Sequence, residues 1–189
     1  MESLKTVKDK SYIVLLAVMA LIMMACQPVG SGSYRGGMPR EYHTAYIQSY
    51  GQCYDSVPHN VVALDLYSDH LSLDESTGVM TGTGYNLYLS DIFIAGNTLE
   101  PGTYRSSTSA EPFTFLPGRD YEGTPHGLYL LYVEEDKLQS INVLDSGTMV
   151  VRDTTNNLLD LQFTLYFRNS YGGRATYKTH FQGELKPKQ

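Results

Sequence analysis

The chain has no tryptophan and only two cysteines among its 189 residues, and it is poor in basic residues. Lysine and arginine number 14 against 20 acidic residues, which gives a formal net charge of −6. Proteins that bind nucleic acid need a basic surface to neutralise phosphates, so this balance argues against DNA or RNA as a partner. The excess of acid mainly favours solubility.

Signatures of the common catalytic sites are also absent from the sequence. There is no Gly-x-Ser-x-Gly or Ser-x-x-Lys motif, and Gly82-Thr83-Gly84 opens an expected strand and not the helix of a phosphate-binding loop. The acidic stretch 69–75 lacks the spacing of a calcium loop. No two of the five histidines lie within four residues, so none has metal-ligand spacing: His43, His59, His70, His126 and His180. We therefore expect no enzyme activity, no catalytic residues, no metal site and no cofactor.

Tyrosine is abundant, at 16 residues, and apolar residues after residue 41 alternate with a period of two. Residues 159, 161, 163, 165 and 167 are apolar, while the residues between them are polar or amphipathic. Such alternation is typical of antiparallel strands with one buried and one wet face. Tyrosine fits half-wet strand surfaces, because its ring is apolar and its hydroxyl can form hydrogen bonds.

The expected fold is all-β, an antiparallel sandwich or barrel of about nine to ten strands in a single domain, 41–189. Residues 68–82 are expected to form a polar loop between two of these strands. Cys53 is expected to be a small, semi-buried residue, and its role stays open. The strands expected are 61–67, 85–93, 104–107, 112–116, 127–134, 138–144, 148–152, 158–167 and a last strand within 174–185.

The long apolar run of the chain, residues 12–25, follows Lys5, Lys8 and Lys10 and ends directly before Cys26. As a helix at about 1.5 Å per residue it reaches about 21 Å, short of the roughly 30 Å hydrocarbon core of a bilayer. A basic head, a short apolar core and a small residue before the cut predict a cleaved signal helix over 1–25. A signal anchor and an ordinary signal peptide with Cys26 as an incidental thiol are the alternatives.

Residues 23–26, Met-Met-Ala-Cys, resemble the lipobox of bacterial lipoproteins, with methionine where the family usually has leucine. The resemblance implies cleavage after Ala25 and acylation of Cys26, which would make the lipid bilayer a partner. The stretch 26–40 is rich in Gly, Ser and Pro and is expected to be a flexible tether. Gln27 follows the cysteine, and by analogy with enteric lipoproteins it favours the outer membrane, on its periplasmic or surface leaflet.

Three short motifs occur in order along residues 83–186: Pro101-Gly102-Thr103-Tyr104, Ser146-Gly147-Thr148-Met149-Val150-Val151 and a closing Gly183-Glu184-Leu185. Through them the domain resembles small all-β lipoproteins of Bacteroidota. The resemblance implies the fold and a cell-envelope location but no activity.

The leading hypothesis is a membrane-anchored cell-envelope lipoprotein whose non-catalytic β-domain binds or scaffolds, with a glycan or an envelope protein as partner. One alternative is a carbohydrate-binding lipoprotein in which outward tyrosines stack on sugar rings, with Tyr88, Tyr166 and one of Tyr129 and Tyr132 as candidates. An unrecognised hydrolase and a small-ligand carrier are further alternatives.

Overall fold

The computed structural model describes residues 37–153, 158–168 and 173–188. The expected cleavage at Ala25, the acylated Cys26 and the signal helix lie outside the described residues. So does most of the expected tether, 26–40. Of its last four residues, 37–40, Met38 packs against the core, and the Pro39 carbonyl accepts a hydrogen bond from the Tyr177 hydroxyl at 2.8 Å.

The described part of the chain is all-β and contains no helix, which confirms the expected fold class. It has more strands than expected, because the eight-residue stretch Thr44–Gly51 and several segments of two to four residues pair as well. The strands are β1 Glu41–Tyr42, β2 Thr44–Gly51, β3 Asn60–Tyr67, β4 Leu71–Asp74, β5 Val79–Gly82, β6 Gly84–Ile94, β7 Gly102–Ser106, β8 Thr114–Phe115, β9 Arg119–Tyr121, β10 Thr124–His126, β11 Leu128–Glu134, β12 Lys137–Val143, β13 Ser146–Asp153, β14 Leu159–Arg168, β15 Arg174–Gly183 and β16 Leu185–Pro187.

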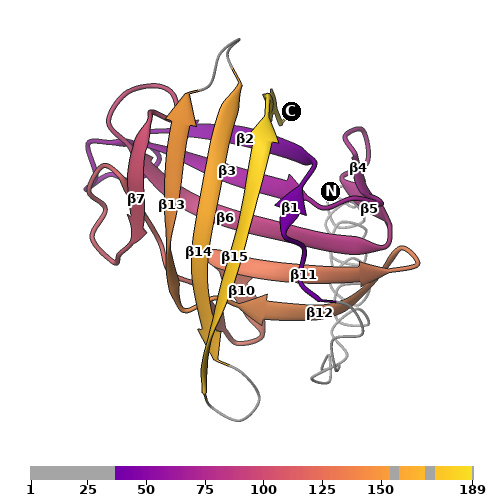
Figure 1. Cartoon of the computed structure of the whole chain (residues 1–189). Helices are drawn as coiled ribbons and strands as arrows, with labels where there is room; N and C mark the ends of the chain where they lie inside the picture. The colour runs from indigo at the N-terminus through magenta and orange to yellow at the C-terminus, as the bar shows by residue number, and fades with distance from the viewer. Residues whose placement is uncertain (1–36, 154–157, 169–172, 189) are drawn as a thin grey trace, which may run out of the picture. The chain divides into compact units, whose positions relative to one another are not determined.

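Twelve of these strands form one large curled sheet, in the order β1-β15-β14-β13-β7-β8-β6-β3-β2-β16, with β11 and β12 added beside β6. The remaining four make two hairpins, β4–β5 and β9–β10. The sheet is mixed and not purely antiparallel, since β1 pairs with β15, β16 with β2 and β7 with β8 in parallel. Figure 1 shows two walls. The front wall is formed by β7, β13, β14 and β15, which cross in front of a back wall formed by β2, β3, β6, β11 and β12.

The two ends of the strand order meet, because β1 and β2 are separated by His43 alone and β15 and β16 by Glu184 alone. The β1/β2 stretch therefore lies along the β15/β16 stretch through two short parallel pairs. We call this contact the seam. Through it a single sheet curls around its own core as a half-barrel.

The core lies between the two walls and is filled by the residues that the alternation predicted. Leu161, Phe163 and Leu165 on β14 are buried, and so are Tyr177 and Phe181 on β15. The back wall contributes a matching set of buried side chains: Leu64, Leu66, Leu87, Leu89, Leu128 and Leu130. Because successive strand residues point to opposite faces, this core fixes which residues of the back wall face outward.

The expectation of a loop at 68–82 is wrong, because this segment contains the β4–β5 hairpin. The segment is rich in Asp, Ser and Thr, and this polar composition hides its two short strands in the sequence. Leu71 is buried, and Leu73 and Met80 pack with it against Tyr46 and Tyr67. The hairpin therefore forms a second, small apolar cluster on the outer side of the back wall.

Candidate functional site

The outer face of the back wall carries tyrosines where an exposed sheet would carry small polar residues. In one cross-strand row, Tyr46 of β2 pairs with Asp65 of β3, Asp65 with Tyr88 of β6, and Tyr88 with Tyr129 of β11. The neighbours of Asp65 and Tyr88 along their strands, such as Leu64 and Leu89, belong to the core, so this row faces away from it.

Tyr88 and Tyr129 lie beside each other, with ring centroids 5.0 Å apart and planes inclined by 36°. Tyr50 comes to the same place from the end of β2, where a bulge between Ser49 and Gly51 shifts the register. Its hydroxyl donates to Gln48 Oε1 at 3.2 Å, and 42 % of the residue is exposed. We call Tyr50, Tyr88 and Tyr129 the tyrosine surface.

The electrostatics of these rings show that they form one group. Burial, followed by the hydrogen bond with Tyr50, raises the pKa of Tyr88. Burial, followed by the charge of Asp65 and the proximity of Tyr50, raises the pKa of Tyr129 to about 12. The hydroxyls of Tyr88 and Tyr129 therefore stay protonated at neutral pH.

Tyr54 extends this surface toward the end of β6. It is 41 % exposed, and its hydroxyl donates to Asp91 Oδ1 at 2.6 Å. That hydrogen bond raises its pKa, with burial as the second cause. Below the ring, Phe93 is buried on the outer side of the sheet, 6.2 Å from Tyr54 between centroids.

Asp65 lies at the inner edge of the tyrosine surface and is only 4 % exposed. Its Oδ2 accepts a hydrogen bond from the Tyr67 hydroxyl at 2.9 Å, and its Oδ1 accepts one from Asn86 Nδ2. The ammonium of Lys188 completes the group with an ion pair to Oδ2. Burial and then the negative charge of Asp65 raise the pKa of Tyr67.

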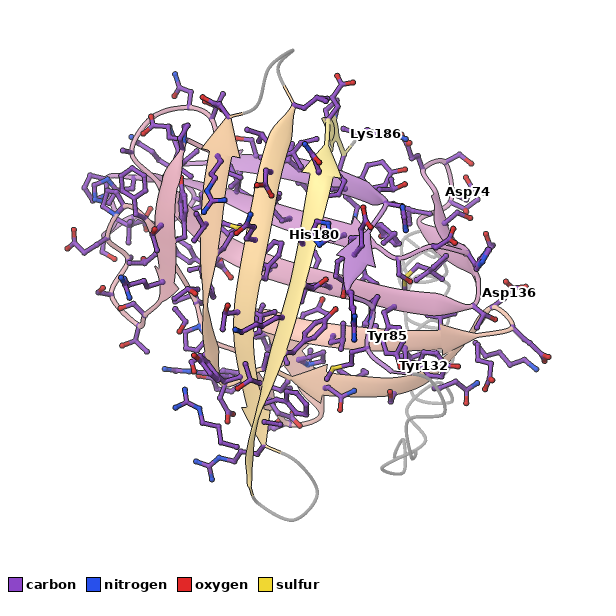
Figure 2. All side chains as sticks on the ribbon, viewed as in Figure 1. Asp74, Tyr85, Tyr132, Asp136, His180 and Lys186 are labelled. Atoms are coloured by element: carbon purple, nitrogen blue, oxygen red, sulfur yellow. The ribbon has the colours of Figure 1, made fainter. Side chains whose placement is uncertain are left out.

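The structure separates the two tyrosines that we expected to stack on a ligand. Tyr88 belongs to the tyrosine surface, whereas Tyr166 lies on β14 in the other wall. The Arg174 guanidinium carbon sits 4.1 Å from the Tyr166 ring centroid and already occupies a face of that ring. Of the pair Tyr129 and Tyr132, only Tyr129 joins the surface. Tyr132 packs against the core beside Tyr85, with centroids 4.9 Å apart (Figure 2).

The other residues considered from the sequence do not assemble into a site. Asp74 caps the hairpin turn through Ser76, and these hydrogen bonds lower its pKa. His180 lies on β15 (Figure 2), its side chain is about half exposed, and its Nδ1 lies 3.0 Å from the Arg40 carbonyl. Cys53 is exposed, so the expectation of a semi-buried thiol is wrong. It lies outside the strands, in the loop that follows β2.

Among residues 37–153, 158–168 and 173–188, no group of three or more His, Cys, Asp or Glu could hold a metal ion. Within the same ranges, no helix has the length and apolar character needed to cross a bilayer. Comparison of the chain with family models, with characterised proteins and with solved structures found no match.

Proposed function

We propose that this protein is a non-catalytic, lipid-anchored protein of the cell envelope whose β-domain binds a saccharide on the tyrosine surface. The observation that carries the binding role is the convergence of Tyr50, Tyr88 and Tyr129 from three strands onto one outer face. Flat aromatic faces bind the apolar faces of sugar rings, and tyrosine adds a hydroxyl that can pair with sugar hydroxyls.

Polar groups flank the rings at both ends, as a saccharide site requires. Gln48 and Asp91 accept hydrogen bonds from Tyr50 and Tyr54 at the exposed end. The Asp65–Lys188 pair lies at the other end. A ligand on the rings would thus find donors and acceptors within reach of its hydroxyls.

The test is binding of the purified full chain to a glycan array, followed by titration of any hit. We expect saturable binding that falls about five- to thirtyfold in Tyr50→Ala, since removal of one stacked ring costs a saccharide roughly 1–2 kcal/mol. Tyr50 is the ring of choice because it is exposed, so its removal should leave the fold intact.

Tyr121→Ala is the matched control, because Tyr121 is 57 % exposed on the separate β9–β10 hairpin. It should bind as the unmodified chain does. An array without hits from folded protein, or an equal loss of binding in both variants, would refute the saccharide role.

The anchoring part of the proposal rests on the lipobox resemblance at Ala25–Cys26. Cells that express the chain should incorporate labelled palmitate into it, and Cys26→Ser should abolish both the label and the membrane association. Cys53→Ser is the control and should retain both. Membrane association that survives Cys26→Ser would favour a signal anchor instead.

A further inference from the structure

Asp65 is a buried carboxylate on the outer face of a sheet, which is an expensive arrangement unless the charge is fully paired. Two of its donors, Tyr67 and Asn86, are neutral groups of the sheet itself. The compensating positive charge comes from outside this wall, from Lys188, 123 residues away in sequence.

The surroundings of the Lys188 ammonium have the chemistry of an ammonium receptor. A carboxylate lies on one side at 2.5 Å, and the Tyr88 ring centroid lies 6.0 Å away. Cations are attracted to the faces of aromatic rings, and the attraction grows when water is excluded. The sheet supplies every one of these groups, so the site does not depend on Lys188 for its construction.

The segment that delivers Lys188 is short, and within it Leu185 alone packs against the core. β16 is three residues long, and β2 is its partner in the sheet order. Beyond it, the Lys188 amide donates to the Ile47 carbonyl at 2.8 Å, and the Lys186 ammonium lies 5.7 Å from the Tyr46 ring centroid. Short segments with a single neighbouring strand belong to the parts of a protein that open locally.

We propose that Asp65, Tyr67, Asn86 and Tyr88 form a binding site for the primary ammonium group of an external ligand, and that Lys188 is its built-in occupant. A ligand bearing a primary alkylammonium group binds Asp65 by displacing Lys188 and releasing segment 186–188. This site shares Tyr88 with the tyrosine surface, but it does not require that surface to bind a saccharide.

The first test is chemical rescue of Lys188→Met, which keeps a side chain of similar length and removes the charge. The loss of Lys188 leaves Asp65 buried without a counter-charge and should lower the Tm. Titration with n-butylammonium should raise the Tm of this variant saturably, by about 2–4 °C or more. In Asp65→Asn/Lys188→Met, which has no charge to pair, the same titration should leave the Tm unchanged.

The second test uses the unmodified chain and so does not depend on any variant folding. A tethered group acts at an effective concentration of the order of millimolar, so n-butylammonium at tens of millimolar should compete with Lys188. Hydrogen exchange of the Lys188 amide should then accelerate at least twofold. Tetramethylammonium at equal ionic strength, which cannot donate a hydrogen bond, should not have this effect.

Rescue that is equal in the double variant, or absent in Lys188→Met, would overturn the proposal. Exchange of Lys188 that n-butylammonium leaves unchanged would do so as well, because Lys188 would then be a permanent structural partner of Asp65. Loss of glycan binding with retention of rescue would remove the saccharide role and leave the ammonium site standing.

Discussion

Two buried tyrosines at the seam form a hydrogen-bonded pair, and replacing one of them should destabilise the fold more than replacing the other. The hydroxyls of Tyr42 and Tyr177 lie 2.9 Å apart, and the residues are 1 % and 3 % exposed. Tyr177 also donates its only proton to the Pro39 carbonyl at 2.8 Å. Tyr42 must therefore be the donor in the bond between the two tyrosines.

The two phenylalanine substitutions differ in how many buried polar groups they leave without a hydrogen-bond partner. Tyr42→Phe removes one hydrogen bond but leaves the Tyr177 proton with its acceptor, so it should cost about 0.5–1.5 kcal/mol. Tyr177→Phe leaves the buried Tyr42 proton without an acceptor and the half-buried Pro39 carbonyl without its donor. It should therefore cost about 2–3 kcal/mol, since each stranded group loses about 1–3 kcal/mol and the carbonyl can still reach water.

Thermal unfolding of the full chain and its variants measures the difference. A domain of this size loses about 2–4 °C of Tm per kcal/mol, so Tyr42→Phe should lower the Tm by about 1–6 °C and Tyr177→Phe by about 4–12 °C, roughly two to three times as much. The double variant should be no less stable than Tyr177→Phe alone, because it no longer holds a stranded Tyr42 proton. Equal losses in the two single variants, or additive losses in the double variant, would refute the assignment of the donors.

Three further predictions concern the fold. Gly118→Ala should lower the unfolding free energy by about 1–3 kcal/mol in urea titrations, because an added Cβ would lie 2.1 Å from the Leu128 carbonyl oxygen. An unchanged unfolding free energy would contradict this and would mean that the backbone can shift. Asp136→Asn should retain more stability than Asp136→Ala, because Asp136 has a φ of 63° and its side chain accepts a bond from the Gly82 amide; equal stabilities would contradict this role. Burial raises the pKa of Tyr177 to about 12, so the unfolded state releases this proton first above pH 10. Stability should thus be complete below pH 10, fall between pH 10 and 12, and fall less steeply in Tyr177→Phe; identical pH profiles would argue against this assignment.

The strands of the front wall could be predicted from the sequence because each has one face toward the core and the other toward solvent. Alternation of apolar residues along 159–167 placed Leu161, Phe163 and Leu165 correctly in the core. The back wall was harder, since β3 is buried almost throughout. The parallel pairs at the seam join segments too far apart in sequence, and too short, for any local pattern to reveal them.

The candidate site was only partly accessible from the sequence. Alternation around Leu87 and Leu89 correctly turned Tyr88 outward, and that signal made Tyr88 a candidate. Tyr50 was missed because a bulge decides its direction, and Lys188 because its role depends on the contact with Asp65. No pattern in one strand could show that Arg174 covers Tyr166, since the two residues lie on neighbouring strands.

The seam has a consequence for how this domain folds. It brings residues 41–47 against 180–187, so its closure joins segments from almost opposite ends of the domain. The entropy of closing so long a loop is lost before the few seam contacts can compensate for it. The two antiparallel three-stranded units, β13–β14–β15 and β2–β3–β6, should therefore form early, and the seam should close last. Refolding should be slow for a chain of this length, and changes at the seam should speed unfolding more than they slow folding.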